Sequence, residues 1–177
     1  MKNATKKTAI ENPMREIKIE KVVLSCGATG LDLEKSKKLL EMLSGKKVQI
    51  IKAGPKRRIP AFNVKPGLEL GTKVTLRKKE AIEILRRLLG AIDNTLSESQ
   101  ISENSFSFGI HEYIEIPGVE YKREIGIRGL NVTVVFIRPG VRVKRKKIKS
   151  SRIPAKQIIS PEEIIRFMEE NFKTKIK

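Results

Sequence analysis

The chain has 177 residues and 39% hydrophobic content, which suit one ordinary domain, and its 38 Lys and Arg against 20 Asp and Glu give a formal net charge of +18. A single Cys and a single His exclude an internal disulfide and a Cys–His metal cluster, so we expect no metal and no cofactor. No apolar run approaches the roughly 20 residues that span a bilayer and no signal peptide begins the chain, so we expect a cytoplasmic protein whose partner is a polyanion other than a membrane.

The first residues, MKNATKKTAIENP, are polar, contain several lysines and end in Asn12-Pro13. Proline disfavours helix at the residue before it, and polar chain ends are often poorly ordered. We therefore interpret residues 1–13 as a flexible arm. Residues 14–177 are expected to form a single domain that carries two projecting basic stretches, a basic loop (52–67) and a basic segment (138–156).

A strand and a helix are predicted at the start of this domain. REIKIEKVVLSCG alternates apolar residues from Ile17 and ends in an apolar run before Gly27, which is typical of a strand that becomes buried along its length. In LDLEKSKKLLEMLSG the leucines recur at helical spacing. Asp32 is the expected N-cap of this helix, and Gly45 is its expected C-terminal stop.

Two strands are predicted on either side of the basic loop. KKVQIIK is a short apolar run, and LELGTKVTLR alternates Leu70, Val74 and Leu76. The loop between them, KAGPKRRIPAFNVKPG, contains five basic residues, no acidic residue, and both proline and glycine. Because it joins two strands, we expect the loop to project from the fold.

The middle of the chain predicts a helix and then a strand. KKEAIEILRRLLGAI repeats apolar residues at the helical period, with Lys and Arg on the other face. DNTLSESQISENS is polar and weakly patterned, after which SFSFGIHEYIEI alternates Phe106, Phe108 and Ile110. This pattern predicts a strand, followed by a loop through Pro117-Gly118.

The strongest strand pattern lies in GIRGLNVTVVFIRPG. Val132, Val134 and Phe136 fall on one side, and Val135 and Ile137 make the other side apolar too. This strand is therefore expected at the centre of a sheet. Alternating strands in mixed order with helices predict an α+β fold with two layers, a mainly antiparallel sheet covered by helices on one face.

The basic segment, RPGVRVKRKKIKSSRIPAK, has nine basic residues and no acidic residue. Such a block is expected to be extended or disordered until a polyanion neutralises it. SPEEIIRFMEENF follows, with Ser160 at the N-cap, Pro161 at N1 and Glu163 at N3, which form a capping box. Its apolar stripe predicts a terminal helix that docks on the body.

Few residues suit catalysis. His111 is either a catalytic base or a surface or hydrogen-bonded histidine at a strand end, and Cys26 is either a reactive thiol or a small packing residue. GATG (27–30) precedes a helix but lacks the spacing of a nucleotide-binding loop. We therefore expect no enzyme; the alternative is an RNA-modifying or RNA-processing enzyme with a basic substrate groove.

Two groups of residues are candidates for polyanion contacts, because phosphate binding requires only cationic side chains and exposed backbone. The first group is Lys52, Lys56, Arg57, Arg58 and Lys65, with Phe62 among them. The second group is Arg142, Lys144, Arg145, Lys146, Lys147 and Lys149. Since no helix-turn-helix or zinc-finger pattern is present, folded RNA is favoured over DNA. A solvated charged surface and a general nucleic-acid-packaging protein are the alternatives.

Several motifs together resemble one known family. NPMREIKIEKVVLSCG is followed in order by LSGKKVQIIKA, LGTKVTLRKKEAIEILRRLL, FSFGIHEYIEIPGVEY and GIRGLNVTVVFIRPG. From Asn12 to Phe172, this series resembles the universal ribosomal protein five family of the large subunit, which binds 5S ribosomal RNA. The RPG motif with its basic continuation is similar to the archaeal and eukaryotic branch.

The resemblance implies a structural protein of the central protuberance that helps attach 5S rRNA to the large subunit. It also implies contacts with large-subunit rRNA, P-site tRNA, a small-subunit head protein and other proteins of the central protuberance. By position, Thr75 in KVTLR, with Arg77 beside it, matches a 5S rRNA contact. The segment from Lys52 onward matches the loop that approaches the tRNA.

Two further positions that match 5S rRNA contacts depart from the family pattern. Ser25 stands where the family usually has asparagine, and Lys46 stands where it usually has glutamine. Serine can donate one hydrogen bond and lysine can reach a phosphate, but neither has the paired donor and acceptor of an amide. The basic loop is also longer than usual, with PAFN in place of an acidic-Phe-Gly stretch.

Overall fold

The computed structural model describes residues 12–177, so the flexible arm predicted at residues 1–13 lies almost wholly outside the described residues. The described chain begins with a short 3-10 helix at Pro13–Arg15. Asn12 caps this turn by accepting a hydrogen bond from the backbone N–H of Met14 at 3.0 Å. The strand predicted from residue 15 therefore starts later, at Lys18.

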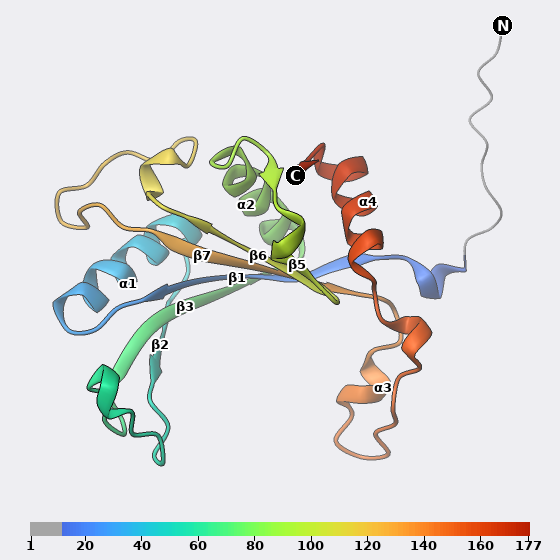
Figure 1. The fold of residues 1–177 in the computed structure, drawn as a ribbon, viewed down its shortest axis with the longest axis horizontal. Coiled ribbons are helices and arrows are strands. Elements are labelled where there is room, and N and C mark those ends of the chain that lie inside the picture. Colours follow the sequence, from blue (N-terminus) through green and yellow to red (C-terminus); the bar gives the residue numbers. More distant parts are fainter. Residues whose placement is uncertain (1–11) are drawn as a thin grey trace, which may run out of the picture.

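A six-stranded antiparallel sheet forms the centre of the fold (Figure 1). Its strands in spatial order are β2 (Gln49–Lys52), β3 (Glu69–Arg77), β1 (Lys18–Gly27), β7 (Leu130–Ile137), β6 (Ser105–Ile110) and β5 (Ile101–Ser102). A separate parallel pair joins β4 (Thr95–Leu96) to β8 (Lys175–Ile176). As predicted from its apolar faces, β7 is a central strand, flanked by β1 and β6.

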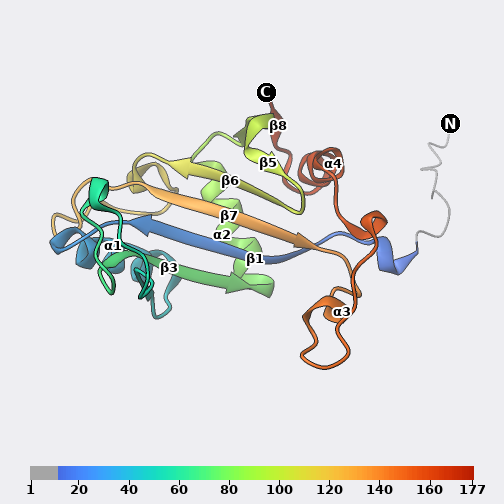
Figure 2. The ribbon, with the colours of Figure 1, turned by 60° about the horizontal axis from the view of Figure 1, so that its bottom comes forward.

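Helices cover one face of the sheet and leave the other uncovered (Figures 1 and 2). The elements α1 (Leu31–Ser44) and α2 (Lys78–Gly90) pack on the covered face, and α4 (Pro161–Phe172) lies near the β5 edge. The short α3 (Arg142–Arg145) belongs to the basic segment. The predicted two-layer α+β fold is confirmed. None of the helices in residues 12–177 is long and apolar enough to cross a membrane.

The core lies between the sheet and the helices. Val22 and Leu24 of β1 are fully buried and pair with Leu76 and Val74 of β3, so one side of each strand faces α1 and α2. Farther along the sheet, aromatic rings from β6 and β7 continue this layer. Period-two alternation in the strands and helical spacing of leucines therefore produce one continuous apolar layer.

The ends of α1 and α4 can be compared with the capping residues that the sequence predicts. The capping box of α4 is confirmed, because the Ser160 backbone N–H donates to Glu163 Oε2 at 3.1 Å and the Glu163 N–H donates to Ser160 Oγ at 3.4 Å. Gly45 ends α1 in a left-handed conformation, as expected. The prediction that Asp32 is the N-cap of α1 is wrong. Gly30 occupies the N-cap, and Asp32 lies in the first turn, where its carboxylate pairs with Arg128.

The basic segment is more ordered than its composition predicts. It contains α3, and two of its arginines have acidic partners elsewhere in the chain: Arg138 pairs with Glu163 at 2.6 Å, and Arg145 pairs with Glu20. The prediction of an extended or disordered block is therefore wrong for this stretch. The prediction assumed that the segment has no acidic partner, but two carboxylates that are distant in sequence supply the counter-charge.

Candidate RNA interface

The uncovered face of the sheet presents three aligned rows of side chains. The strand register gives one row of Arg77, Lys21, Val135 and Ser105. The next row is Thr75, Val23, Thr133 and Ser107. The third row is Gln49, Lys73, Ser25, Asn131 and Gly109. We call these three rows the open face. They belong to the uncovered side of the sheet, which is turned toward the viewer in Figure 2.

The open face is polar and carries positive charge without acidic residues in its rows. Lys21, Lys73 and Arg77 supply cations, and the other polar members supply hydroxyl and amide groups. The hydroxyls of Ser107 and Thr133 lie 3.1 Å apart, within hydrogen-bond distance across β6 and β7. Cations beside hydroxyl and amide donors suit the phosphates and sugars of a nucleic-acid backbone.

The four residues predicted to bind 5S rRNA lie near one another. Ser25, Thr75 and Arg77 all belong to the open face, and Ser25 pairs across the strands with Lys73. Lys46 follows α1 and lines a pocket of about 560 Å³ together with Thr75 and Arg77. Residues from separate parts of the sequence thus meet at the β3 side of the sheet.

This pocket adjoins the start of α2. Lys46 forms an ion pair with Glu80, while Lys78 and Lys79 also line the pocket. Arg77, the N-cap of α2, makes no side-chain capping bond, and Lys78 has a φ of +58°, which is uncommon for a residue other than glycine. The first N–H groups of α2 therefore add to the positive potential that an anion meets here.

The basic loop is an ordered excursion between β2 and β3. Its base is closed by hydrogen bonds from Ala53 N to Leu68 O at 2.7 Å and from Gly67 N to Ala53 O at 3.2 Å. Near its tip, Ile59 and Val64 exchange two backbone hydrogen bonds of 3.0 and 3.1 Å. These bonds enclose the short helix Pro60–Phe62.

The side chain of Phe62 sits on this turn and is 77% exposed. Lys52 at the loop base pairs with Glu69 at 3.1 Å. Within residues 12–177, no ion pair is formed by the other cations of the loop, which are Lys56, Arg57, Arg58 and Lys65. The loop therefore presents an exposed aromatic ring among cations that have no intramolecular partner in the described chain.

The basic loop and the basic segment extend from opposite ends of the sheet but toward the same side (Figure 1). In that view both lie below the sheet, whereas α1, α2 and α4 lie above it. Of the predicted contact residues in the basic segment, Arg145 is bound to Glu20. The remaining five, Arg142, Lys144, Lys146, Lys147 and Lys149, are exposed. The open face is thus flanked by two basic projections.

Sequence reasoning missed Lys21, Lys73 and Asn131. Their signal was present in the alternation of the strands, because residues two positions apart share a face. Lys73 lies two residues before Thr75, and the register aligns it with Ser25. Which strands are neighbours could not be read from this alternation.

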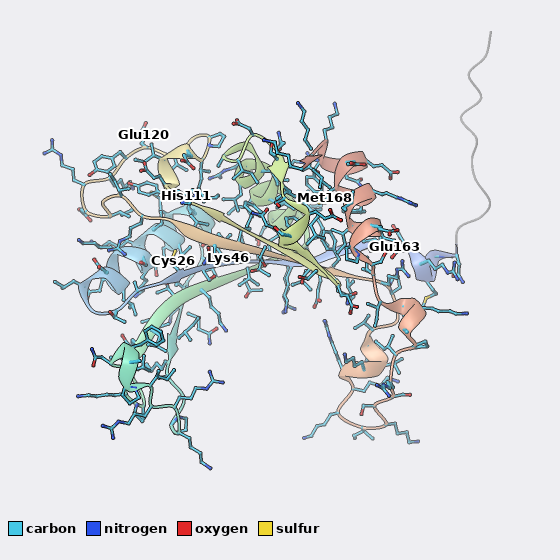
Figure 3. All side chains as sticks on the ribbon, in the orientation of Figure 1. Cys26, Lys46, His111, Glu120, Glu163 and Met168 are labelled. Carbon is cyan, nitrogen blue, oxygen red and sulfur yellow. The ribbon has the colours of Figure 1, made fainter. Side chains whose placement is uncertain are left out.

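The two residues weighed for catalysis are separated in the fold: one follows β6 and the other lies in β1 (Figure 3). His111 is exposed immediately after β6, whereas Cys26 is buried on the helix-covered side of β1. In the part of the chain that the structure describes, no three His, Cys, Asp or Glu side chains gather in a group that could hold a metal ion. The packing interpretation of Cys26 agrees with its burial.

Cys26 is expected to resist alkylation in the folded protein. Its Sγ lies 3.5 Å from the carbonyl oxygen of Gly129, and burial raises the pKa of the thiol from 9.0 to about 11. The unfolded chain therefore loses this proton first, so the thiol's contribution to stability falls as pH rises from 9.0 toward about 11. Mass spectrometry after maleimide treatment at about pH 8, just below the ordinary pKa of a thiol, should detect labelling only in denaturant. Rapid labelling of the native protein would contradict this burial.

The fold and this interface define a class of protein. An α+β domain with one uncovered cationic sheet face, flanked by two basic projections, has the geometry of a nucleic-acid-binding protein. A family model that describes the C-terminus of the ribosomal protein L5 family matches residues 69–157. This range includes β3, β7 and the basic segment.

Curated relatives extend the match over nearly the whole chain. The large ribosomal subunit protein uL5 of Nanoarchaeum equitans is 41% identical over 170 residues, which cover 94% of this chain and 99% of the relative. The uL5 proteins of Sulfurisphaera tokodaii and Methanococcoides burtonii are 40% and 37% identical, over 96% and 95% of this chain and 97% and 100% of theirs. The chain therefore belongs to the ribosomal protein L5 family, whose members are large-subunit ribosomal proteins and not enzymes. The resemblance found in the sequence, including its archaeal character, is confirmed.

Proposed function

We propose that this ribosomal protein binds 5S rRNA through the open face and helps attach that RNA in the central protuberance of the large subunit. The observation that carries the proposal is the meeting of Ser25, Thr75 and Arg77 on one uncovered face, with Lys46 at its edge. Ser25, Lys46 and Thr75 are the positions that the family resemblance matches to 5S rRNA contacts, and Arg77 is the residue predicted beside Thr75. Large-subunit rRNA is the proposed partner of the basic segment.

The chemistry of the open face favours recognition of RNA shape. Its three rows contain no aromatic side chain on which a base could stack, whereas hydroxyls and cations are abundant. Double-stranded RNA is recognised mainly through its phosphates and 2′-hydroxyl groups. A folded RNA with helical segments therefore fits this face better than an extended single strand.

Titration with 5S rRNA at several salt concentrations tests this proposal. We expect tight binding that weakens steeply with salt, because phosphate contacts release counterions. An unrelated folded RNA and a DNA duplex of equal length are the controls. Equal affinity for all three would favour general nucleic-acid packaging, and turnover of the RNA would favour the alternative of an RNA-processing enzyme.

We also propose that the basic loop contacts the P-site tRNA. In support, the loop is closed at its base and near its tip by backbone hydrogen bonds, so its cations and Phe62 project without the loop having to fold on binding. An exposed aromatic ring beside arginines suits the irregular surface of a folded tRNA. Contacts with a small-subunit head protein and with other proteins of the central protuberance complete the proposed environment.

Replacing Lys56, Arg57 and Arg58 with Gln is expected to weaken tRNA placement while leaving 5S rRNA binding largely unchanged. The reason is that these residues lie in the loop between β2 and β3, away from the three rows of the open face. Crosslinking in intact ribosomes, with mapping of the crosslinked nucleotides, measures both contacts.

The matched control replaces Lys35, Arg86 and Arg87, which are cations of α1 and α2 on the helix-covered side. It removes the same charge from another surface. Equal loss of tRNA and 5S rRNA crosslinks in the loop variant would contradict the division between loop and sheet.

A further inference from the structure

The two ends of the basic segment are held together where it joins the rest of the domain. We call this junction the neck. Arg138 Nη1 donates to the carbonyl oxygen of Lys156 at 3.0 Å, and Gln157 Nε2 donates to the carbonyl oxygens of Pro139 and Met14, each at 2.9 Å. These bonds join the two ends of the excursion. Gly140 follows the neck with a φ of +94°, a conformation that glycine adopts without strain.

Hydrogen bonds inside the segment make its outer part a small ordered unit. The backbone N–H of Lys146 donates to Arg142 O at 3.0 Å, and the N–H of Ser151 donates to Val143 O at 3.2 Å. Neither bond reaches the rest of the protein. These bonds hold the outer part together but do not attach it to the sheet.

A contact with the sheet joins Arg145 to Glu20 of β1. The two guanidinium nitrogens of Arg145 donate to the two carboxylate oxygens of Glu20 at 2.5 and 2.8 Å, the paired geometry that is strongest between these groups. The side chain of Glu20 is only 11% exposed. The carboxylate of Glu20 is therefore largely enclosed by the protein, whereas Arg145 approaches it from the basic segment.

A bulge in β1 occurs at Glu20. The pairing of β1 with β7 shifts register between Ile19, which faces Phe136, and Lys21, which faces Val135. Glu20 is the extra residue between them. Bulges of this kind redirect a side chain, and here the redirected side chain meets the basic segment.

Glu20 lies between cations of two different surfaces. Besides its hydrogen bond with Arg145, the positive charges of Lys21 and Arg77 on the open face lower the pKa of its carboxyl, against an opposing effect of burial. The carboxylate therefore offsets repulsion between the basic segment and the sheet.

We propose that Glu20 is a positioning residue for RNA binding, which holds the basic segment beside the open face so that cations of both contact the same RNA. This inference rests on the proposed function. Under this proposal, the acidic residue Glu20 increases the affinity for RNA although RNA is itself negatively charged.

Glu20→Gln gives a test in which two explanations predict opposite signs. If charge alone governs binding, removing a carboxylate beside cations strengthens RNA binding. If Glu20 positions the basic segment, affinity for 5S rRNA falls by about threefold to tenfold, because the segment must be ordered on binding. Glu124→Gln is the matched control: Glu124 is exposed and pairs with Lys38 of α1, so the same charge change does not alter the pair between Glu20 and Arg145.

Hydrogen exchange of the free protein provides a readout that does not need RNA. The amides of Lys146 and Ser151 are expected to exchange faster in Glu20→Gln than in the wild type, and at an unchanged rate in Glu124→Gln. Should Glu20→Gln not fold, Arg145→Gln is compared with Arg142→Gln, because both remove one exposed cation of the segment and only Arg145 contacts Glu20. A larger loss of affinity for Arg145→Gln supports positioning.

Equal or tighter RNA binding by folded Glu20→Gln, or equal losses for the two arginine variants, would overturn the inference. Absence of 5S rRNA binding by the wild type would instead overturn the proposed function, while the exchange measurement still decides whether Glu20 orders the basic segment.

Discussion

Replacing Lys73 and Arg77 together with Gln is expected to lower the affinity for 5S rRNA by about 100-fold, which corresponds to about 1.4 kcal/mol for each lost contact. Both side chains lie on the open face, in the rows that contain Ser25 and Lys21. Neither forms an ion pair within residues 12–177, so each is available to a phosphate. Their loss removes charge from the β3 side of the open face, where the predicted 5S rRNA-binding residues lie.

The salt dependence separates phosphate contact from general attraction. Because each cation that neutralises a phosphate contributes to counterion release, the slope of log affinity against log salt should fall by about two in the double variant. Arg86→Gln with Arg87→Gln is the control, since it removes two charges from the exposed side of α2. If both double variants lose affinity equally, net charge and not the open face governs binding.

Phe106→Ala is expected to destabilise the protein by about 3–5 kcal/mol, a large part of the stability of an ordinary domain. The Phe106 side chain is 1% exposed, and its ring lies 6.0 Å from that of Phe108 and 5.7 Å from that of Phe136 between centroids. Truncation removes buried apolar surface and leaves a cavity that neighbouring strands cannot close, because β6 is hydrogen-bonded to β7.

Unfolding in denaturant, followed by circular dichroism, measures this loss. Phe62→Ala is the matched control: it makes the same change at an exposed position of the basic loop and should alter stability by less than about 0.5 kcal/mol. Similar losses for the two variants would contradict the assigned core.

Much of the fold could be predicted from local pattern. The capping box of Ser160 and Glu163, the stop at Gly45 and the alternation of Phe106 with Phe108 each involve residues close in sequence, and each has the expected structure. The predictions failed where the local structure depends on residues that are distant in sequence. Asp32 is no cap, since α1 already begins at Leu31, and its carboxylate pairs with the distant Arg128. The polar stretch before β6 contains β4, which exists only because β8 pairs with it.

The candidate site was predictable in part. The family resemblance identified Ser25, Lys46, Thr75 and Arg77, and composition identified both basic stretches. The role of Glu20 had no sequence signal, because an isolated glutamate in a strand does not reveal that a bulge turns it toward Arg145.

Sequence patterns alone were enough to predict the longer strands and helices, the cationic character and the family of this protein. Alternation, capping and charge act between near neighbours along the chain, so they can be read directly. The strand order, the meeting of Thr75 with Ser25 on one face, the common side of the two basic stretches and the ion pair between Arg145 and Glu20 were decided only by the tertiary structure. These contacts join residues far apart in sequence, and a pairing register between strands cannot be inferred from either strand alone.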